Sequence, residues 1–317
     1  MRSLKIKTSY EVAFSPDGLT VLALGRDISL WSINDRKKQW RVHPFSHPSN
    51  GTFSPDGKSI AIKNTAGQIV VLDAATGVTE FDFKNQSEGE GSNVCFSPLG
   101  DQLIDGSWDG LLTVRSRCSK EILFRTQFLG EMVTRIHKSN TGDFFISEHH
   151  PKATTYDKPP GNCYFLKWTW PIGSVEPKRI PFNAPFVKSS ALHPTGRCMV
   201  VVYGAPPNKM VLFDLSGGDI RWIQEVQFGG SGSSLKWSHC GQFVGAVQGD
   251  RIAVYYFKDG ALIESRGLPY PSDVDFSPDT SLIAFGSWQE GFVEDFALKD
   301  RIAGGGCRVT EKFKCEK

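Results

Sequence analysis

The 317-residue sequence has little of what is typical of an exported, membrane-spanning or nucleic-acid-binding protein. Its longest apolar run, at 252–257, has about six residues, whereas a bilayer-spanning helix needs about 20. The opening residues, MRSLKIKTSYEVAF, lack the apolar core of a signal peptide. The net charge is only +2 and there is no long run of like charges, so neither a membrane nor a nucleic acid is expected as a partner. We therefore expect a cytoplasmic protein.

Cysteine pairs and catalytic motifs are also missing. The seven cysteines are odd in number and scattered, without a C-x-x-C pair, which argues against a disulfide framework. There is no G-x-S-x-G, H-E-x-x-H, P-loop or G-x-G-x-x-G motif to carry a nucleophile, zinc or phosphate. The glycine-rich segment 229–234 precedes a strand rather than a helix, so it offers no helix N-terminus to a phosphate. We expect no cofactor, no metal and no enzymatic activity.

A repeated turn sequence is the strongest feature of the chain. F-S-P-D-G occurs at 14–18 and 53–57, with close copies at 96–100 and 276–280. Degenerate copies occupy 137–142, 192–196 and 237–241. The copies end at positions 18, 57, 100, 142, 196, 241 and 280, which are separated by 39, 43, 42, 54, 45 and 39 residues. That period is typical of a four-stranded propeller blade, with an insertion in the longest interval.

Each copy lies between two short β-type runs, such as 10–14 and 20–24, and further strands follow, such as 28–31. Proline fixes the second position of a turn, and Asp-Gly tolerates the left-handed conformation that closes a hairpin. The sequence therefore predicts an all-β fold, a seven-bladed β-propeller of four-stranded antiparallel blades closed into a ring. Residues 1–300 would form this single domain, and 301–317 a C-terminal tail or closing strand.

Either end of the chain offers an outer strand for the last blade. Leu4 and Ile6 alternate with Lys5 and Lys7, as in a strand with one buried face. The stretch 307–313 is the alternative. We favour the N-terminal strand, residues 3–8.

The repeats resemble those of the WD-repeat family over about residues 3–300. The likeness is closest in SWDGLLTV, at 107–114, and in the F-S-P-D-G turns. No Gly-His pair precedes a repeat, and no Trp-Asp pair ends a third strand, Phe213-Asp214 being the nearest. The Asp–His–Ser–Trp network of that family is therefore expected to be largely missing. The resemblance implies a ring with two loop sets on one face: outer strand to next blade, and second strand to third.

That mapping places large aromatic side chains and an arginine on one face. Such residues are the usual anchors of protein interfaces. We predict a non-catalytic module (a scaffold, adaptor or neutralising partner), monomeric by itself, that binds another protein or a peptide there. The alternative for the loop phenylalanines, which include Phe128 and Phe182, is core packing between blades. The predicted contact residues are Tyr10, Arg26, Phe45, Trp108, Tyr156, Phe186, Tyr270 and Trp288.

Two other functions stay open. A propeller enzyme, hydrolase or lactonase-like, would use carboxylates that converge at the channel mouth. A deep central pocket would instead favour a peptide or small-molecule sensor. The simpler role of acidic turn residues is to cap backbone N–H groups. The carboxylates in second-turn positions are Asp27, Asp105, Asp109, Glu148, Asp250 and Glu290.

The insertion in the fourth repeat, at about 148–162, contains Glu148, His149 and His150, which are zinc-binding residue types. Adjacent residues on an extended chain point in opposite directions, however, and the spacing of a four-ligand site is absent. We therefore expect a surface loop.

Overall fold

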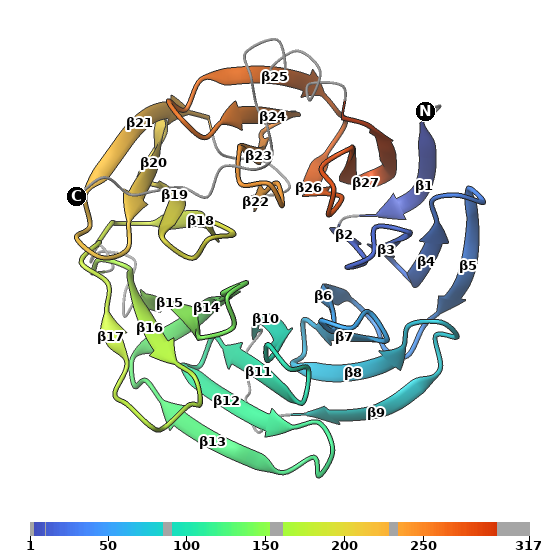
Figure 1. Ribbon diagram of the computed structural model, residues 1–317, viewed down its shortest axis with the longest axis horizontal. Coiled ribbons are helices and arrows are strands. Elements are labelled where there is room, and N and C mark those ends of the chain that lie inside the picture. Colours follow the sequence, from blue (N-terminus) through green and yellow to red (C-terminus); the bar gives the residue numbers. More distant parts are fainter. Residues whose placement is uncertain (1–2, 10, 85–90, 153–160, 228–233, 297–317) are drawn as a thin grey trace.

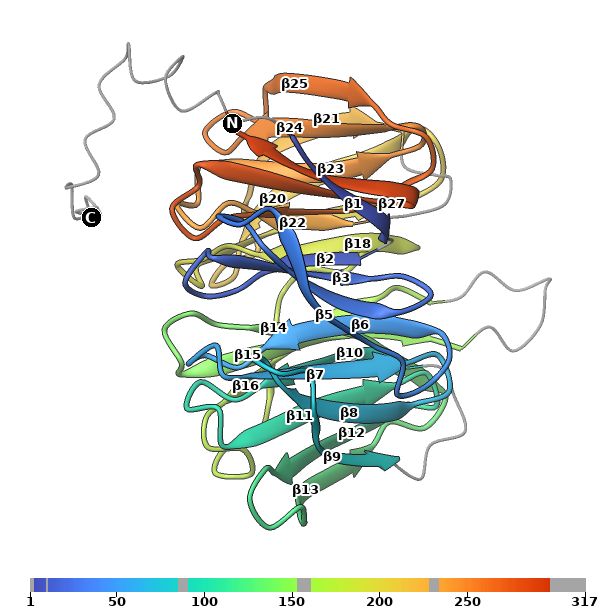
Figure 2. The same ribbon diagram turned by 90° about the vertical axis from the view of Figure 1, so that its right-hand side faces the viewer.

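The computed structural model describes residues 3–9, 11–84, 91–152, 161–227 and 234–296. Over these residues the chain forms strands and turns and no helix, and its seven sheets are arranged in a ring (Figure 1). Seen edge on, the ring is a disc with connections on both faces (Figure 2). The predicted all-β, seven-bladed β-propeller is confirmed. The described part of the chain has no helix long and apolar enough to span a membrane.

In six blades the four strands neighbour one another in chain order, each antiparallel to the next, and the first strand lies nearest the axis (Figure 1). These blades comprise β2 (Glu11–Phe14), β3 (Thr20–Leu24), β4 (Ile28–Ser32) and β5 (Lys37–Val42); β6 (Pro48–Phe53), β7 (Ser59–Asn64), β8 (Gln68–Asp73) and β9 (Thr79–Lys84); β10 (Gly91–Phe96), β11 (Gln102–Ser107), β12 (Leu111–Ser116) and β13 (Ile122–Gln127); β14 (Glu131–Lys138), β15 (Phe144–Pro151), β16 (Tyr164–Thr169) and β17 (Lys178–Arg179); β18 (Val187–Leu192), β19 (Cys198–Tyr203), β20 (Asn208–Asp214) and β21 (Ile220–Val226); and β22 (Leu235–Trp237), β23 (Phe243–Gln248), β24 (Arg251–Tyr256) and β25 (Leu262–Gly267).

The seventh blade joins the two ends of the ring. Its strands are β26 (Pro271–Phe276), β27 (Leu282–Asp295) and β1 (Leu4–Ser9). Residues 283–287 of β27 pair with β26, and residues 287–293 pair with β1. The N–H of Phe296 donates to the carbonyl of Ser281, so β27 folds back on itself and supplies two of the four strands. The N-terminal strand is the outer strand, as predicted; the alternative, 307–313, lies outside the described residues.

The seven repeated turns share one geometry. In each, the N–H of the last turn residue donates to the carbonyl three residues earlier, at 2.8–3.3 Å. That last residue is glycine in six copies and Thr280 in the seventh, and all seven have φ between 57° and 79°. Glycine adopts this conformation without strain, which explains why the motif ends in it.

Seven hydrophobic clusters fill the seven gaps between blades. A blade has two apolar faces, and each cluster combines one face from each of two neighbours. Between the fourth and fifth blades, Phe182 stacks on Phe213 with ring centroids 4.2 Å apart. Phe182 is therefore a core residue. Burial of this kind stabilises the ring by about 25 cal/mol per Å² of apolar surface.

The insertion in the fourth blade begins later than predicted. β15 continues to Pro151, so the prediction of a loop from residue 148 is wrong for residues 148–151. The reason is that β14 is long enough to pair Met132 with His150 and Glu131 with Pro151. Residues 153–160 lie outside the described residues.

Candidate functional site

Two sets of loops meet on one face of the ring. One set precedes the first strand of each blade, and the other joins its second and third strands. Backbone hydrogen bonds link the sets: the N–H of Gly204 donates to the carbonyl of Phe186 at 3.3 Å, and that of Trp288 to Tyr270 at 3.1 Å. The predicted placement of both sets on one face is confirmed. We call this the loop face, and the opposite face, with the seven repeated turns, the turn face.

Every large aromatic side chain that is exposed, among the described residues, lies on the loop face. Trp108 is 40% exposed, Phe186 45%, Trp288 56% and Tyr270 60%. Arg26, in the loop between β3 and β4, is exposed as well. The structure thus brings five of the eight predicted contact residues to the surface of one face.

The other predicted contact residues do not add to this surface. Phe45 is half-buried and packs against the cluster between the first and second blades. Tyr10 and Tyr156 lie outside the described residues. Leu129, 87% exposed before β14, was not predicted, since a single aliphatic loop residue has no distinguishing pattern. Its neighbour Phe128 packs against the core cluster between the third and fourth blades.

Two of the exposed rings are carried by strained backbone. Phe186 and Tyr270 each directly precede the first strand of a blade, with φ of 53° and 49°. His47 and Gly130 occupy the same place before β6 and β14, with φ of 54° and 76°. A left-handed residue other than glycine costs roughly 1–2 kcal/mol. Gly130 shows that glycine serves at this position, so the fold itself does not require an aromatic residue there.

Trp108 and Trp288 occupy equivalent places in the third and seventh blades, after the second strand. Each follows a serine that is only 1% exposed, Ser107 or Ser287. The Ser107 hydroxyl accepts from the N–H of Leu111 at 3.2 Å, and the Ser287 hydroxyl donates to the carbonyl of Pro269 at 2.8 Å. These buried hydroxyls hold tight turns that project both indoles from the blade.

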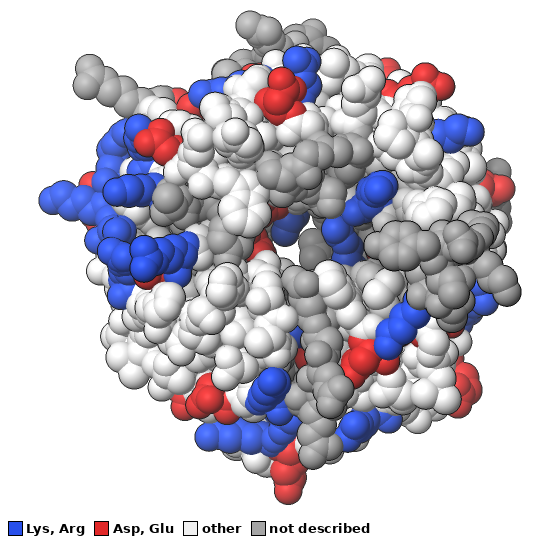
Figure 3. Space-filling model, turned by 180° about the vertical axis from the view of Figure 1, so that it is seen from behind, with Lys and Arg blue, Asp and Glu red and all other residues white. Residues whose placement is uncertain are grey.

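A cavity of about 620 Å³ at the centre of the ring is a second candidate site. It is lined by the first strands of the blades and by Trp288 of the loop face. From behind, the ring is hollowed at its centre, with Lys or Arg and Asp or Glu side chains within the hollow (Figure 3). Its volume lies in the range of small-molecule sites, about 300–1,000 Å³.

A belt of polar side chains surrounds the cavity. Six of its seven described residues hydrogen-bond to the next blade: Asp273, for example, accepts from the N–H of Val12 at 3.0 Å, and Glu11 accepts from that of Gly51 at 3.1 Å. The two asparagines of the belt do the same in the next two gaps, so the belt satisfies N–H groups that the edges of the first strands leave unpaired. The belt takes the residue seven positions before the end of each repeated turn: Glu11, Asn50, Asn93, Arg135, Ser189, Ser234 and Asp273.

The carboxylates predicted for an enzyme site do not converge. None of these six described residues lines the cavity, because second turns lie one strand farther from the axis than the first strands do. Asp105, for example, is buried in an ion pair with Lys63 between the second and third blades. The carboxylates that do line the cavity are Glu11 and Asp273. These two residues were not predicted from the sequence, although both occupy the same position in their repeats, seven residues before the end of the turn.

Burial and mutual repulsion perturb the groups around these carboxylates. Burial, followed by the charge of Asp273, raises the pKa of Glu11 to about 8. Burial also raises the pKa of Asp275, which accepts from the N–H of Phe14 at 2.8 Å. Burial acts to lower the pKa of Lys236, but the neighbouring carboxylates outweigh it and raise that pKa. At neutral pH Glu11 is therefore largely protonated and Lys236 charged.

The Glu148-His149-His150 segment divides between two networks. Glu148 Oε1 lies 2.6 Å from His150 Nε2. His149 points to the other side of the strand, with Nε2 2.8 Å from Ser147 Oγ and Nδ1 3.2 Å from Glu131 Oε2. Across the described ranges, no three His, Cys, Asp or Glu side chains are grouped to hold a metal ion.

The His149 network is structural. Trp168 Nε1 donates to Ser147 Oγ at 2.8 Å, which extends it to a Trp–Ser–His–Glu chain inside the fourth blade. The order Ser–His–Glu also occurs in nucleophilic catalysis. Ser147 and His149 are each 0% exposed, however, so no substrate reaches them.

The sequence matches no protein-family model and no curated protein sequence. Among solved structures, it is similar to a chain of hydrazine synthase from Kuenenia stuttgartiensis, with a TM-score of 0.75. The two share 13% sequence identity, over 92% of this chain and 96% of that chain. At this identity the similarity shows a common propeller fold and nothing about activity.

Proposed function

We propose that this protein is a non-catalytic binding module of the WD-repeat type that holds another protein or a peptide against its loop face. The observation that carries the proposal is that, among the described residues, every exposed aromatic ring lies on that face. Two of them, Phe186 and Tyr270, occupy left-handed positions where glycine would be less strained. Strained backbone tends to persist at functional sites, and large exposed rings are the commonest anchors of protein interfaces.

A catalytic role has less support. The carboxylates of the enzyme alternative are dispersed, and the Ser147–His149 pair is buried. Four exposed aromatic side chains on one face of the propeller fit a binding partner better, since aromatic residues are common anchors of protein interfaces.

The test compares two double variants with the wild type. The face variant carries Trp108→Ser and Trp288→Ser. The rim variant carries Ile223→Ser and Leu262→Ser, whose side chains are 51% and 56% exposed on the outer strands β21 and β25. Each tagged protein is used to capture a partner from extracts of the source cells, and the dissociation constant is then measured with the purified partner.

The face variant is expected to bind the partner at least about 30-fold more weakly, equivalent to about 2 kcal/mol. The rim variant should bind like the wild type, and all three should share a thermal midpoint to within about 3 °C. Unchanged affinity of a folded face variant would refute the proposal. If the face variant unfolds, the two indoles are core residues, and Tyr270→Ser becomes the deciding variant.

A further inference from the structure

A second ring of side chains, two residues after each belt member, leaves open space in the central cavity. Five members line the cavity, all but Ala13 and Asp275. Four members are small and the other three have longer or charged side chains, so the ring encloses a chamber rather than a packed core. The members are Ala13, Thr52, Cys95, His137, Ala191, Lys236 and Asp275.

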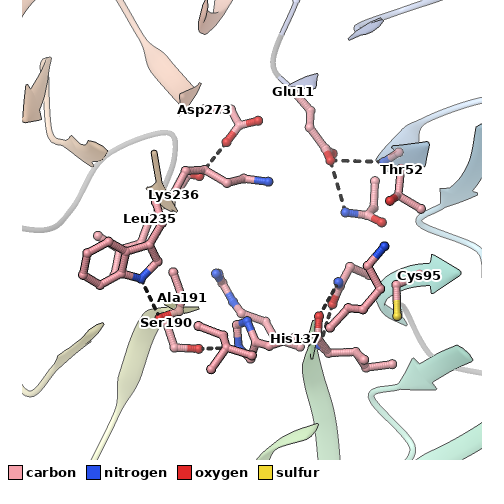
Figure 4. A pocket seen from close by; sticks show the side chains of 18 of the residues that line it. Glu11, Thr52, Cys95, His137, Ser190, Ala191, Leu235, Lys236 and Asp273 are labelled. Atoms are coloured by element: carbon pink, nitrogen blue, oxygen red, sulfur yellow. Dashed lines mark hydrogen bonds between the residues drawn. The ribbon is translucent and has the colours of Figure 1, made fainter. Parts of the chain in front are cut away.

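The belt side chains hydrogen-bond to neighbouring blades, whereas the Lys236 side chain forms no hydrogen bond with another described residue. Asp273, for example, accepts from both the N–H of Val12 and the hydroxyl of Ser234. The Lys236 side chain instead extends its ammonium group into the cavity (Figure 4). The hydroxyl of Ser272, which also lines the cavity, is buried without a hydrogen-bond partner in the described part of the chain.

Basic groups from two blades face one another across the fifth blade. Arg135 and His137 on β14 and Lys236 on β22 all line the cavity. Arg135 lies close enough to Lys236 that its positive charge acts to lower the pKa of Lys236, against the carboxylates that raise it. Burial is the main cause that lowers the pKa of His137, and the charge of Lys236 contributes. Lys138 lines the same cavity nearer the turn face.

Acidic groups offset this positive charge only in part. Of the two carboxyls that line the cavity, Glu11 has a pKa of about 8 and is largely protonated at neutral pH. Asp273 is bound on both oxygens, and Asp275 faces Lys236 from the neighbouring strand while accepting from Phe14. Arg135, Lys138 and Lys236 therefore line the cavity, whereas its carboxyls are Asp273 and the largely protonated Glu11.

We propose that this cavity binds a small molecule through an oxyanion, a carboxylate or a phosphate, placed between Lys236 and Arg135. The oxyanion accepts from the Lys236 ammonium, and it offers the Ser272 hydroxyl the acceptor that the protein does not provide. Such charge-assisted hydrogen bonds are roughly twice as strong as neutral ones. The site shares only Trp288 with the predicted loop-face contact residues, and Lys236 and Arg135 are not among those residues, so anion binding is tested without the proposed protein partner.

Isothermal titration calorimetry of the purified protein at pH 7 and constant ionic strength tests this site. Inorganic phosphate and succinate are titrated separately, so that the one that binds identifies the type of oxyanion. We expect one-to-one binding of at least one of them and at least tenfold weaker binding to Lys236→Met. The control Lys178→Met, on the exposed outer strand β17, should bind like the wild type. No binding of either anion to the wild type, or equal binding to Lys236→Met, would overturn the proposal.

A second variant keeps the test valid if Lys236→Met does not fold, since that change leaves Asp273 and Asp275 without their counter-charge. Thr52→Phe fills part of the cavity and leaves every charge in place. It should weaken binding of the same anion at least tenfold. Unchanged affinity would place the anion outside the cavity, as an adventitious surface ion, and would overturn the proposal as well.

Discussion

On the turn face each blade repeats its neighbour, whereas on the loop face the blades differ. A Cβ placed on Gly57 would lie 3.6 Å from Pro16, and one on Gly100 would lie 3.3 Å from Pro55, so consecutive turns pack in the same way. On the loop face, the connection at 65–67 has three residues and that at 152–163 has twelve. Contact between neighbouring turns keeps the turn face regular, whereas the connections of the loop face vary in length from blade to blade.

The two faces also use left-handed backbone differently. Six of the seven repeated turns place glycine there, at little conformational cost. Each face also has three residues other than glycine in that conformation, counted over the described residues: Arg36, Lys120 and Thr280 on the turn face, and His47, Phe186 and Tyr270 on the loop face. The faces differ in which side chains these residues carry, because two of the three on the loop face are exposed aromatic rings.

The largest predicted loss of stability follows from a substitution on the turn face, at Gly241. An added Cβ would lie 2.5 Å from Nε2 of His193, whose ring packs against Trp237 and lies 3.0 Å from the Gly241 carbonyl. Because the ring cannot move away and φ is +71°, Gly241→Ala should lower the free energy of unfolding by at least about 2 kcal/mol. Urea denaturation measures the change.

The loop face supplies the matched control for this glycine. Gly130 has a similar φ of +76°, but nothing lies within 4 Å of an added Cβ. Gly130→Ala should therefore cost only the backbone strain, about 1 kcal/mol. Equal losses for the two alanine variants would mean that turn packing contributes nothing and that the two faces do not differ in this respect.

The repeat made the turn face predictable. A local sequence, F-S-P-D-G, specifies the hairpin turn, and its seven copies give the number of blades without any knowledge of long-range contacts. The closing strand was also predictable, because Leu4 and Ile6 alternate with lysines and both are buried, at 4% and 0% exposure. Phe45 shows the limit: whether a loop ring packs or projects depends on how its loop crosses the gap.

The cavity was less predictable for the same reason. Aligning the repeats would have shown a polar residue at every belt position, so the belt was within reach of the sequence. The electrostatics of the cavity could not be predicted from the sequence, because the pKa of Glu11 depends on Asp273, which lies 262 residues away along the chain. Such pairings appear only when the ring closes.

A smaller effect is expected in the belt, which belongs to the regular part of the ring. Because the pKa of Glu11 is raised to about 8, the folded protein keeps a proton that the unfolded chain releases above about pH 4.5. The free energy of unfolding should therefore fall as the pH rises from about 4.5 to about 8. Glu11→Gln removes the titration and keeps an oxygen to accept from Gly51.

Urea denaturation at pH 5 and pH 8.5 distinguishes the two proteins. The wild type should lose at least about 1 kcal/mol more than Glu11→Gln over this interval. Parallel pH profiles would mean that Asp273, Asp275 and Lys236, the charged groups facing Glu11, already compensate its burial. The belt would then be a purely structural feature, as regular as the turn face.

The smallest effect is expected at Phe186, where the contrast between the faces is most direct. Phe186→Ala removes the ring and keeps a Cβ in the left-handed conformation, whereas Phe186→Gly removes both. If the backbone is strained, the glycine variant should be more stable than the alanine variant by about 1 kcal/mol, measured as the difference in urea midpoints at equal slope. Both should bind the partner equally weakly, since both lack the ring. Equal stability of the two variants would show that the left-handed position carries no strain, and the aromatic residue there would then need no functional explanation.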